Sequence, residues 1–261
     1  MRRFNAAVDV GGTFIDVVLA DAATQDVRVA KVLHRQGSQG ADILEAIGRM
    51  VASFDASLSE LDTVVLGTTV VTNALLEGTL ARTALLTTEG FCDVLEIARM
   101  TRPSAYDPHR RRPTPVVPRR HRLEVRERLA HDGEVLQPLD EGSVCRHLAA
   151  LAEERVEAVA ICLLYSFVDP SHERRVRDLV AREMAVPISL SSEVMPVFRE
   201  YERMTATAIN AATSPLMGQF LDGLKSLGEG GGTRCYIMGS SGGCLTFPEA
   251  RRFPVKCATS G

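Results

Sequence analysis

The chain has 261 residues and a formal net charge of −3 at pH 7. Hydrophobic residues make up 45% of it, which excludes a disordered chain and allows a sizeable core. The near balance of charges argues against nucleic acid or an anionic membrane as a partner, and no apolar run approaches the ~18–20 residues of a membrane span. The N-terminus reaches Asp9 and two glycines before the core of a signal peptide could form.

Six cysteines are present, without a CxxC pair and without the Cys and His spacing of a zinc site. Several stand in apolar stretches such as AVAICLLYSF, where a reduced cysteine behaves as a small hydrophobic residue. We therefore expect free thiols and a cytoplasmic protein.

The order of strands and helices predicts an α/β fold. The first two strands are separated only by Gly11, Gly12 and Thr13, which indicates a tight hairpin and makes the sheet mixed. From residue 140 onward, strands and helices alternate. The expected strands are 4–10, 14–20, 27–33, 63–66, 83–86, 122–128, 158–164, 187–190 and 234–238. The strand at 122–128 is followed by a turn at 131–133 and a return strand. The expected helices are 41–54, a helix that begins near 69–72, 140–155, 170–184 and 198–227, and Pro215 kinks or restarts the last of them.

The segment 99–128 differs in composition from the rest of the chain. Its ten arginines, three acidic residues and five prolines give a local charge of +7 and forbid a continuous helix. We interpret it as a solvated surface loop rather than as a binding surface for an anionic ligand or a partner subunit. The expected domains are a hairpin-led α/β lobe at 1–98, this loop with a hairpin at 99–139, an α/β segment at 140–197, and a long helix with the start of a further, incomplete portion at 198–261.

The segment DVGGTFIDVVLAD, residues 9–21, carries the clearest chemistry. Gly11 and Gly12 permit positive φ and a close approach of backbone N–H groups to phosphate oxygens, and Thr13 adds a hydroxyl donor. Asp9, at the end of the first strand, could hold a hydrated Mg²⁺ or orient a water, so it is the expected metal ligand; Asp16 could share the site as a second catalytic carboxylate. The alternative is a hairpin turn that merely needs two glycines.

These residues resemble the first phosphate-binding hairpin of the actin-like, ribonuclease H-like ATPase fold. Further segments resemble the hydantoinase A/5-oxoprolinase family, which includes N-methylhydantoinase A and the acetone carboxylase β subunit. The similarity covers the whole chain in order and rests on the stretches GTTVVTNALLEG, RTALLTTEGFCDVLEIAR, VPRRHRLEVRERLAHDGEVLQPLD, EAVAICLLYSFVDPSHERRV, SLSSEVMPVFREYERMTATAINA and ARRFPVKCATSG.

The resemblance implies an ATP- and Mg²⁺-dependent enzyme that phosphorylates the oxygen of a cyclic amide or a ketone, so that hydrolysis or carboxylation can follow. Such chemistry needs positioned donors and a metal more than a covalent nucleophile. It also implies a B-type hydantoinase subunit as partner. Family members are more than twice as long and continue from Ser260 and Gly261 into PAGG. We therefore expect an N-terminal portion that hydrolyses ATP negligibly alone.

Three positions depart from the family pattern. Leu66 stands where the family usually has His, Ile15 where it usually has Thr, and the late turn reads GSSGG in place of QSNGG. Each change removes a polar group near the expected site, so the substrate class stays open.

Two further turns are candidates for contact with substrate or nucleotide, because each follows a strand end. The ordinary alternative for the first is capping of a helix by Thr68 or Thr69. The cluster at 199–203 is interpreted mainly as helix-surface ion pairs. The candidate residues of the two turns are Gly67, Thr68, Thr69, Asn73, Ser240, Ser241, Gly242 and Gly243.

Two other functions remain open. A small-molecule kinase of the same fold would leave phosphate stably on a hydroxyl or carboxyl product. A non-catalytic module would bind a partner and no nucleotide.

Overall fold

The computed structural model describes residues 3–33, 39–100, 106–107, 109, 113–227 and 232–258. Two compact units divide the chain. Unit 1 consists of Met1–Thr79 and Leu216–Gly261, and unit 2 of Leu80–Pro215. These units cut the chain differently from the four segments expected, because the residues after Pro215 return to supply strands to unit 1.

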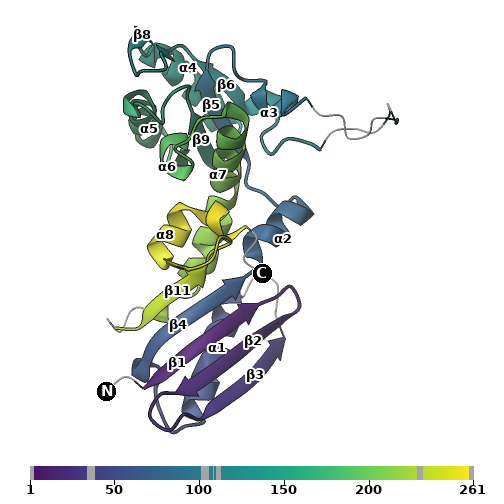
Figure 1. Ribbon diagram of the computed structural model, residues 1–261, viewed down its shortest axis with the longest axis vertical. Helices are drawn as coiled ribbons and strands as arrows, with labels where there is room; N and C mark the ends of the chain where they lie inside the picture. Colours follow the sequence, from purple (N-terminus) through teal and green to yellow (C-terminus); the bar gives the residue numbers. More distant parts are fainter. Residues whose placement is uncertain are drawn as a thin grey trace. The chain divides into compact units, whose positions relative to one another are not determined.

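Unit 1 is built on a six-stranded sheet in the order β12-β11-β4-β1-β2-β3 (Figure 1). β1 runs antiparallel to β2 and parallel to β4, and β11 runs parallel to β4, so the expected mixed sheet is confirmed. The strands are β1 (Phe4–Val10), β2 (Phe14–Asp21), β3 (Val27–Leu33), β4 (Leu61–Thr68), β11 (Arg234–Met238) and β12 (Cys244–Thr246).

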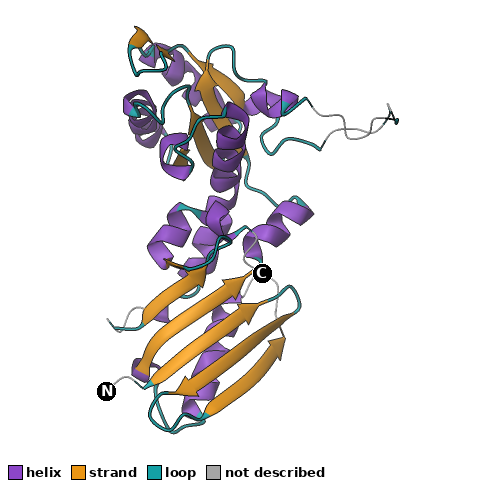
Figure 2. Ribbon diagram, in the orientation of Figure 1, coloured by secondary structure: helices purple, strands orange, loops and turns teal. Residues whose placement is uncertain are grey.

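Helix α1 (Gln39–Ala52) packs on one face of this sheet, where Ile43 and Ile47 are fully buried (Figure 2). The opposite face carries exposed Val27 and Val29 on β3. The remaining helical elements of unit 1 are α2 (Val70–Glu77), α8 (Phe247–Arg252), the end of α7 (Glu200–Asp222) and short 3-10 turns at Leu58–Glu60, Lys225–Leu227 and Pro254–Cys257.

Unit 2 contains a parallel four-stranded sheet in the order β10-β9-β5-β6. Every residue of β5 and β9 is buried, as expected for parallel strands covered on both faces. One face packs against α4 and α5, and the other against α3 and the first part of α7. The elements are β5 (Thr83–Thr88), α3 (Val94–Ile97), β6 (Arg122–Val125), α4 (Glu141–Glu153), β9 (Ala158–Cys162), α5 (Ser171–Glu183), β10 (Ile188–Leu190) and α6 (Ser191–Val194), with a small hairpin of β7 (Arg128–Leu129) and β8 (Val135–Gln137) and a 3-10 turn at Arg119–His121.

Two sequence expectations need correction. The strand expected at 122–128 is two strands, because β6 pairs with β5 whereas β7 pairs with β8, and the buried Glu127 between them bonds Thr88 and His172. Helix α7 does not restart at Pro215 but continues to Asp222, where the expected helix ran to 227. Buried residues on both sides of the proline, such as Ala211 and Met217, pack that helix into the cores.

Most of the residues 101–112 lie outside the described part of the chain, as do Ser260 and Gly261. The solvated arginine-rich loop therefore stays a prediction there. Within the described residues, no helix combines the length and the apolar character that crossing a membrane requires.

Candidate phosphate-binding site

Three parallel strands of unit 1 end at one edge of the sheet, and the predicted site segments follow them. Residues 11–13 follow β1, α2 follows β4, and the turn 239–243 follows β11. The register sets Asp9 beside Gly67 and Ile237 beside Leu66, so the three strand ends are level (Figure 1). The fold therefore brings together all the segments that the sequence singled out in this unit.

The first hairpin turn presents two backbone donors to solvent. The N–H of Gly11 donates to the carbonyl of Phe14 at 3.0 Å and closes the base of the turn. Gly12 and Thr13 are exposed, and no described residue accepts a hydrogen bond from either N–H. Backbone N–H groups that no residue engages, at an exposed turn, are available to an anion.

The reason for glycine in this turn differs from the sequence expectation. Neither Gly11 nor Gly12 has a positive φ. A Cβ on Gly11 would instead lie 3.1 Å from the carbonyl oxygen of Phe14, which is tighter than ordinary contact. Close approach of the backbone, and not a left-handed conformation, therefore favours glycine at position 11.

Two carboxylates lie next to each other across the hairpin, since Asp9 pairs in register with Asp16. Asp16 forms an ion pair with Lys31 of β3 at 3.1 Å, which compensates its charge. Asp9 is exposed, and within the described residues no cation pairs with it. Its Oδ1 lies 3.2 Å from the point where a Cβ on Gly67 would stand. Of the two carboxylates, Asp9 is the one available to a metal ion.

Lys31 was not among the residues expected at this site. Lys31 could have been found from the alternating pattern of the first three strands. Once their register is known, that pattern places residues 9, 16 and 31 on one face of the sheet.

The residues at the start of α2 bond mainly to their neighbours. The hydroxyl of Thr68 accepts the N–H of Val70 at 3.2 Å, whereas Thr69, the N-cap residue of α2, makes no side-chain capping hydrogen bond. The hydroxyl of Thr69 donates to the carbonyl of Val10 at 3.2 Å and accepts from Nδ2 of Asn73 at 3.1 Å. This Nδ2 would lie 3.8 Å from a Cβ on Gly12, so Asn73 is next to the hairpin turn.

The late turn GSSGG uses several of its amides internally. The N–H of Ser240 donates to Lys256 at 2.7 Å, and that of Gly242 donates to Gly239 at 3.1 Å. Gly242 and Gly243 have φ values of 87° and 77°, which the turn between β11 and β12 requires. Ser241 is exposed at its tip. This turn therefore offers a ligand fewer donors than its glycines suggested.

Two of the three departures from the expected family pattern are core residues. Leu66 and Ile15 are both fully buried in the apolar core of unit 1. Core packing accounts for the apolar residue at each position.

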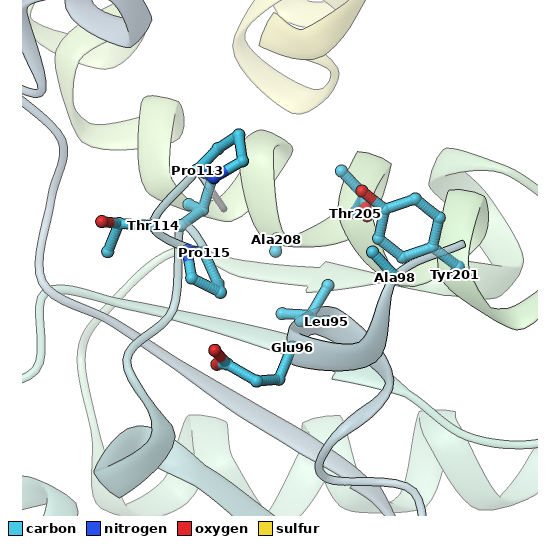
Figure 3. A pocket seen from close by; sticks show the side chains of 10 residues that line it. Leu95, Glu96, Ala98, Pro113, Thr114, Pro115, Tyr201, Thr205 and Ala208 are labelled. Carbon is cyan, nitrogen blue, oxygen red and sulfur yellow. The ribbon is translucent and has the colours of Figure 1, made fainter. Parts of the chain in front are cut away.

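Most of the cluster at 199–203 has structural partners within unit 2. Nε of Arg99 donates to Glu202 at 2.6 Å, so the partner of Glu202 lies outside the helix and not on its own surface as expected. Arg203 is buried and donates to Ser166 Oγ at 2.6 Å and to the carbonyl of Leu163 at 2.9 Å. Tyr201 instead lines a cavity (Figure 3).

The donor set at the sheet edge suits phosphate oxygens with Mg²⁺. Magnesium is commonly held by one or two carboxylates together with phosphate oxygens and water, which a single exposed Asp9 allows. Among the described residues, no three His, Cys, Asp or Glu side chains gather into a metal site. A protein-only metal cage is therefore not the arrangement found in this part of the chain.

Two family models match the chain. Residues 5–184 match the hydantoinase/oxoprolinase N-terminal region, and residues 203–261 match the hydantoinase/oxoprolinase model. The caprolactamase subunit alpha of Pseudomonas jessenii is 34% identical over 87% of this chain and 34% of its own length. The acetophenone carboxylase gamma subunit of Aromatoleum aromaticum is 32% identical over 94% of this chain and 36% of its own.

The fold is also similar to a solved structure. The crystal structure of the ATP-dependent caprolactamase from Pseudomonas jessenii superimposes with a TM-score of 0.87 at 31% identity, covering 98% of this chain and 38% of that one. The chain thus spans little more than a third of the length of these three relatives. On the family models and these similarities, the chain belongs to the hydantoinase/oxoprolinase family.

Proposed function

We propose that unit 1 binds the terminal phosphates of Mg·ATP at the turn 11–13. This binding is one step of an ATP-dependent reaction on a cyclic amide or a ketone. The observation that carries the proposal is the pair of exposed amides at Gly12 and Thr13, three and four residues after the exposed carboxylate of Asp9. Free N–H donors can bind the phosphate oxygens, and a carboxylate beside them can bind the metal ion of the same complex.

Each residue has a distinct part in this proposal. The N–H groups of Gly12 and Thr13, with the Thr13 hydroxyl, bind phosphate oxygens, and Gly11 keeps the turn closed. Asp9 holds Mg²⁺ directly or through water, and Asp16, with Lys31, sets the charge beside it. Bound Mg²⁺ would neutralise charge on the phosphates during transfer. Gly67 leaves room for the Asp9 carboxylate.

The other candidates take supporting parts. Thr68 and Thr69 fix α2 against β1, which keeps Asn73 beside the turn. Ser241 and Gly243 are the late-turn residues whose N–H groups no described residue engages, so they are the ones proposed to contact nucleotide or substrate.

The relatives support an ATP-dependent enzyme. The similar crystal structure is that of an ATP-dependent caprolactamase, and other relatives include 5-oxoprolinases. Because the chain spans 38% of the caprolactamase chain, the proposal assigns it phosphate and Mg²⁺ binding and expects negligible turnover of ATP from residues 1–261 alone.

Two further properties are part of the proposal. Two relatives are named as an alpha and a gamma subunit, which supports a B-type hydantoinase subunit as partner. All six cysteines lie in the described residues and are free thiols, which supports the cytoplasm as the compartment.

The test is isothermal titration calorimetry of residues 1–261 with ATP, with and without Mg²⁺. Asp9→Asn should weaken Mg·ATP binding by about tenfold or more, because a metal ligand is lost, and should not weaken binding of metal-free ATP, because a carboxylate that repels the phosphates is removed. Asp26→Asn is the matched control, since it removes the same charge from unit 1 at the far end of β2, where Asp26 bonds the backbone of Asp21.

Binding of Mg·ATP by the wild-type chain and by Asp26→Asn, with loss in Asp9→Asn, supports the proposal. A folded wild-type chain that binds no Mg·ATP contradicts it. So does an Asp9→Asn chain whose affinity for Mg·ATP equals that of the wild type.

A further inference from the structure

We propose that Lys31 makes the binding of a divalent cation to Asp9 depend on nucleotide. The ammonium of Lys31 engages the carboxylate of Asp16, so only the carboxylate of Asp9 is left for the metal ion, and phosphate oxygens have to supply the other anionic ligands. The inference rests on the proposed function for the choice of Asp9 as the metal ligand. It adds the form in which the site takes its ligand, which is the metal–nucleotide complex and not the free ion followed by ATP.

Three charged residues form one row across the first three strands. Asp9 of β1 is directly opposite Asp16 of β2, and Asp16 is directly opposite Lys31 of β3. Residues directly opposite each other on antiparallel strands have Cβ atoms about 4.5–5.5 Å apart, so one metal ion can contact both carboxylates. Like charges at this spacing also repel each other. The two carboxylates would therefore attract a free divalent cation if nothing compensated the charge of either.

The ammonium of Lys31 has two partners, and both are on β2. Its Nζ lies 3.1 Å from Oδ1 of Asp16 and 5.1 Å from the centre of the Phe14 ring. The second distance is within the range of a cation–π contact. Phe14 directly follows the turn, and its carbonyl accepts the N–H of Gly11. Lys31 is therefore held against the strand that leaves the turn, where its charge compensates Asp16 and leaves Asp9 unpaired among the described residues.

The number of uncompensated carboxylates decides which ligand is favoured. With Lys31 in place the row has one such carboxylate, and without Lys31 it has two. A single carboxylate holds Mg²⁺ weakly, because this ion gives up its water reluctantly and needs further oxygen ligands. The phosphates of ATP supply those oxygens, and one carboxylate repels them less than two would. The ion pair of Lys31 with Asp16 therefore favours the metal–nucleotide complex over the free ion.

The experiment measures binding of Mn²⁺, which takes the same oxygen ligands as Mg²⁺, to the full 261-residue chain without nucleotide. Electron paramagnetic resonance reports the concentration of the free ion. Lys31→Met leaves two adjacent carboxylates uncompensated and should raise the affinity for Mn²⁺ about fivefold or more over that of the wild type. In a separate titration, the same variant should bind metal-free ATP about threefold more weakly, because the second carboxylate repels the phosphates. A merely structural role of Lys31 would not strengthen cation binding while it weakens anion binding.

Further variants assign the effect to the ion pair. Lys31→Met combined with Asp16→Asn has a single uncompensated carboxylate again and should bind Mn²⁺ as the wild type does. Lys31→Arg keeps the charge and should also match the wild type, whereas the uncharged Lys31→Gln should repeat the gain. The matched control is Arg28→Met, which removes a positive charge from the opposite face of the same strand, where Arg28 donates to the carbonyl of Ser53 at 2.7 Å. This control should leave the affinity for Mn²⁺ unchanged.

Two results would overturn the inference. One is an affinity for Mn²⁺ that is the same in the folded Lys31→Met and Lys31→Gln chains as in the wild type. The other is a gain that persists when Asp16→Asn is added. Because the Mn²⁺ titrations contain no nucleotide, these results bear on Lys31 alone, whereas a wild-type chain that binds no Mg·ATP contradicts the proposed function.

Discussion

The carboxylate of Asp9 occupies the space that a side chain on Gly67 would need. The two residues are neighbours across the parallel pair β1 and β4, and a Cβ on Gly67 would lie 3.2 Å from Asp9 Oδ1. That separation is tighter than ordinary contact, and the exposed carboxylate is the partner able to move. Glycine at position 67 therefore allows Asp9 its observed orientation at the sheet edge.

Gly67→Ala should turn the Asp9 carboxylate aside and weaken Mg·ATP binding about three- to tenfold. The cost in stability should stay within about 1 kcal/mol, because only an exposed carboxylate has to give way. Calorimetric titration measures the first effect and urea denaturation the second. An unchanged affinity for Mg·ATP would show that the orientation of Asp9 has no part in binding.

Gly40→Ala should destabilise the fold by about 1–3 kcal/mol, since overpacking is relieved only by movement of the main chain. A Cβ on Gly40 in α1 would lie 2.6 Å from backbone atoms of Gly223, which follows α7. The matched control is Gly48→Ala in the same helix, where a Cβ would meet nothing within 4 Å. That change should stabilise by about 0.5–1 kcal/mol through helix propensity.

The midpoints of urea denaturation of Gly40→Ala and Gly48→Ala, compared with that of the wild type, measure the two changes in stability. Equal effects of the substitutions at positions 40 and 48 would contradict the close packing of α1 against residue 223.

The buried Asp21 should make the stability of the chain sensitive to acid. Its hydrogen bond with the Arg3 guanidinium holds the pKa of this carboxyl well below its usual range, and the N–H of Ala23 adds a hydrogen bond at 2.8 Å. A carboxyl with a lowered pKa stabilises the fold above its unfolded pKa of about 3.9, and that contribution is lost as the pH falls toward the folded value.

The free energy of unfolding of the wild-type chain should therefore fall more steeply between about pH 5 and pH 3 than that of Asp21→Asn. Other carboxyls with lowered pKa values, such as Glu141 and Asp169, titrate in both chains and cancel in the comparison. Parallel pH profiles of the two chains would contradict the role of Asp21.

The six thiols should differ in reactivity toward iodoacetamide at about pH 8. Burial raises the pKa of Cys162 to about 12 and that of Cys257 to about 11, so little thiolate forms at either. Cys145 and Cys244 are exposed and should be alkylated first. Peptide mass spectrometry of the folded chain identifies the modified residues, and early alkylation of Cys162 would contradict the packing of β9.

Much of the fold was predictable from local pattern. The alternation of β1 and β2 and the three residues between them indicated the hairpin, and the strand expected at 158–164 corresponds to β9 at Ala158–Cys162. The break between β6 and β7 was not predictable, because the buried Glu127 at that point accepts a long-range hydrogen bond from the hydroxyl of Thr88. The return of residues 216–261 to unit 1 likewise depends on pairing of β11 with β4.

The candidate site was predictable in its residues but not in its details. Gly-Gly after a strand indicated an anion-binding turn, yet only the structure shows that Gly11 already donates to Phe14 and that the free amides are those of Gly12 and Thr13. The pairing of Lys31 with Asp16 left no signal in either residue alone, because it depends on the register of β2 with β3.

The most direct test of the central claim is an amide NMR titration of the ¹⁵N-labelled chain with Mg·ATP. The account predicts that the amide resonances of Gly12 and Thr13 shift most and saturate, and that adenosine with Mg²⁺ leaves them in place, since the phosphates are what those amides bind. Resonances of Gly12 and Thr13 that stay fixed at saturating Mg·ATP, or that respond equally to adenosine, would contradict it.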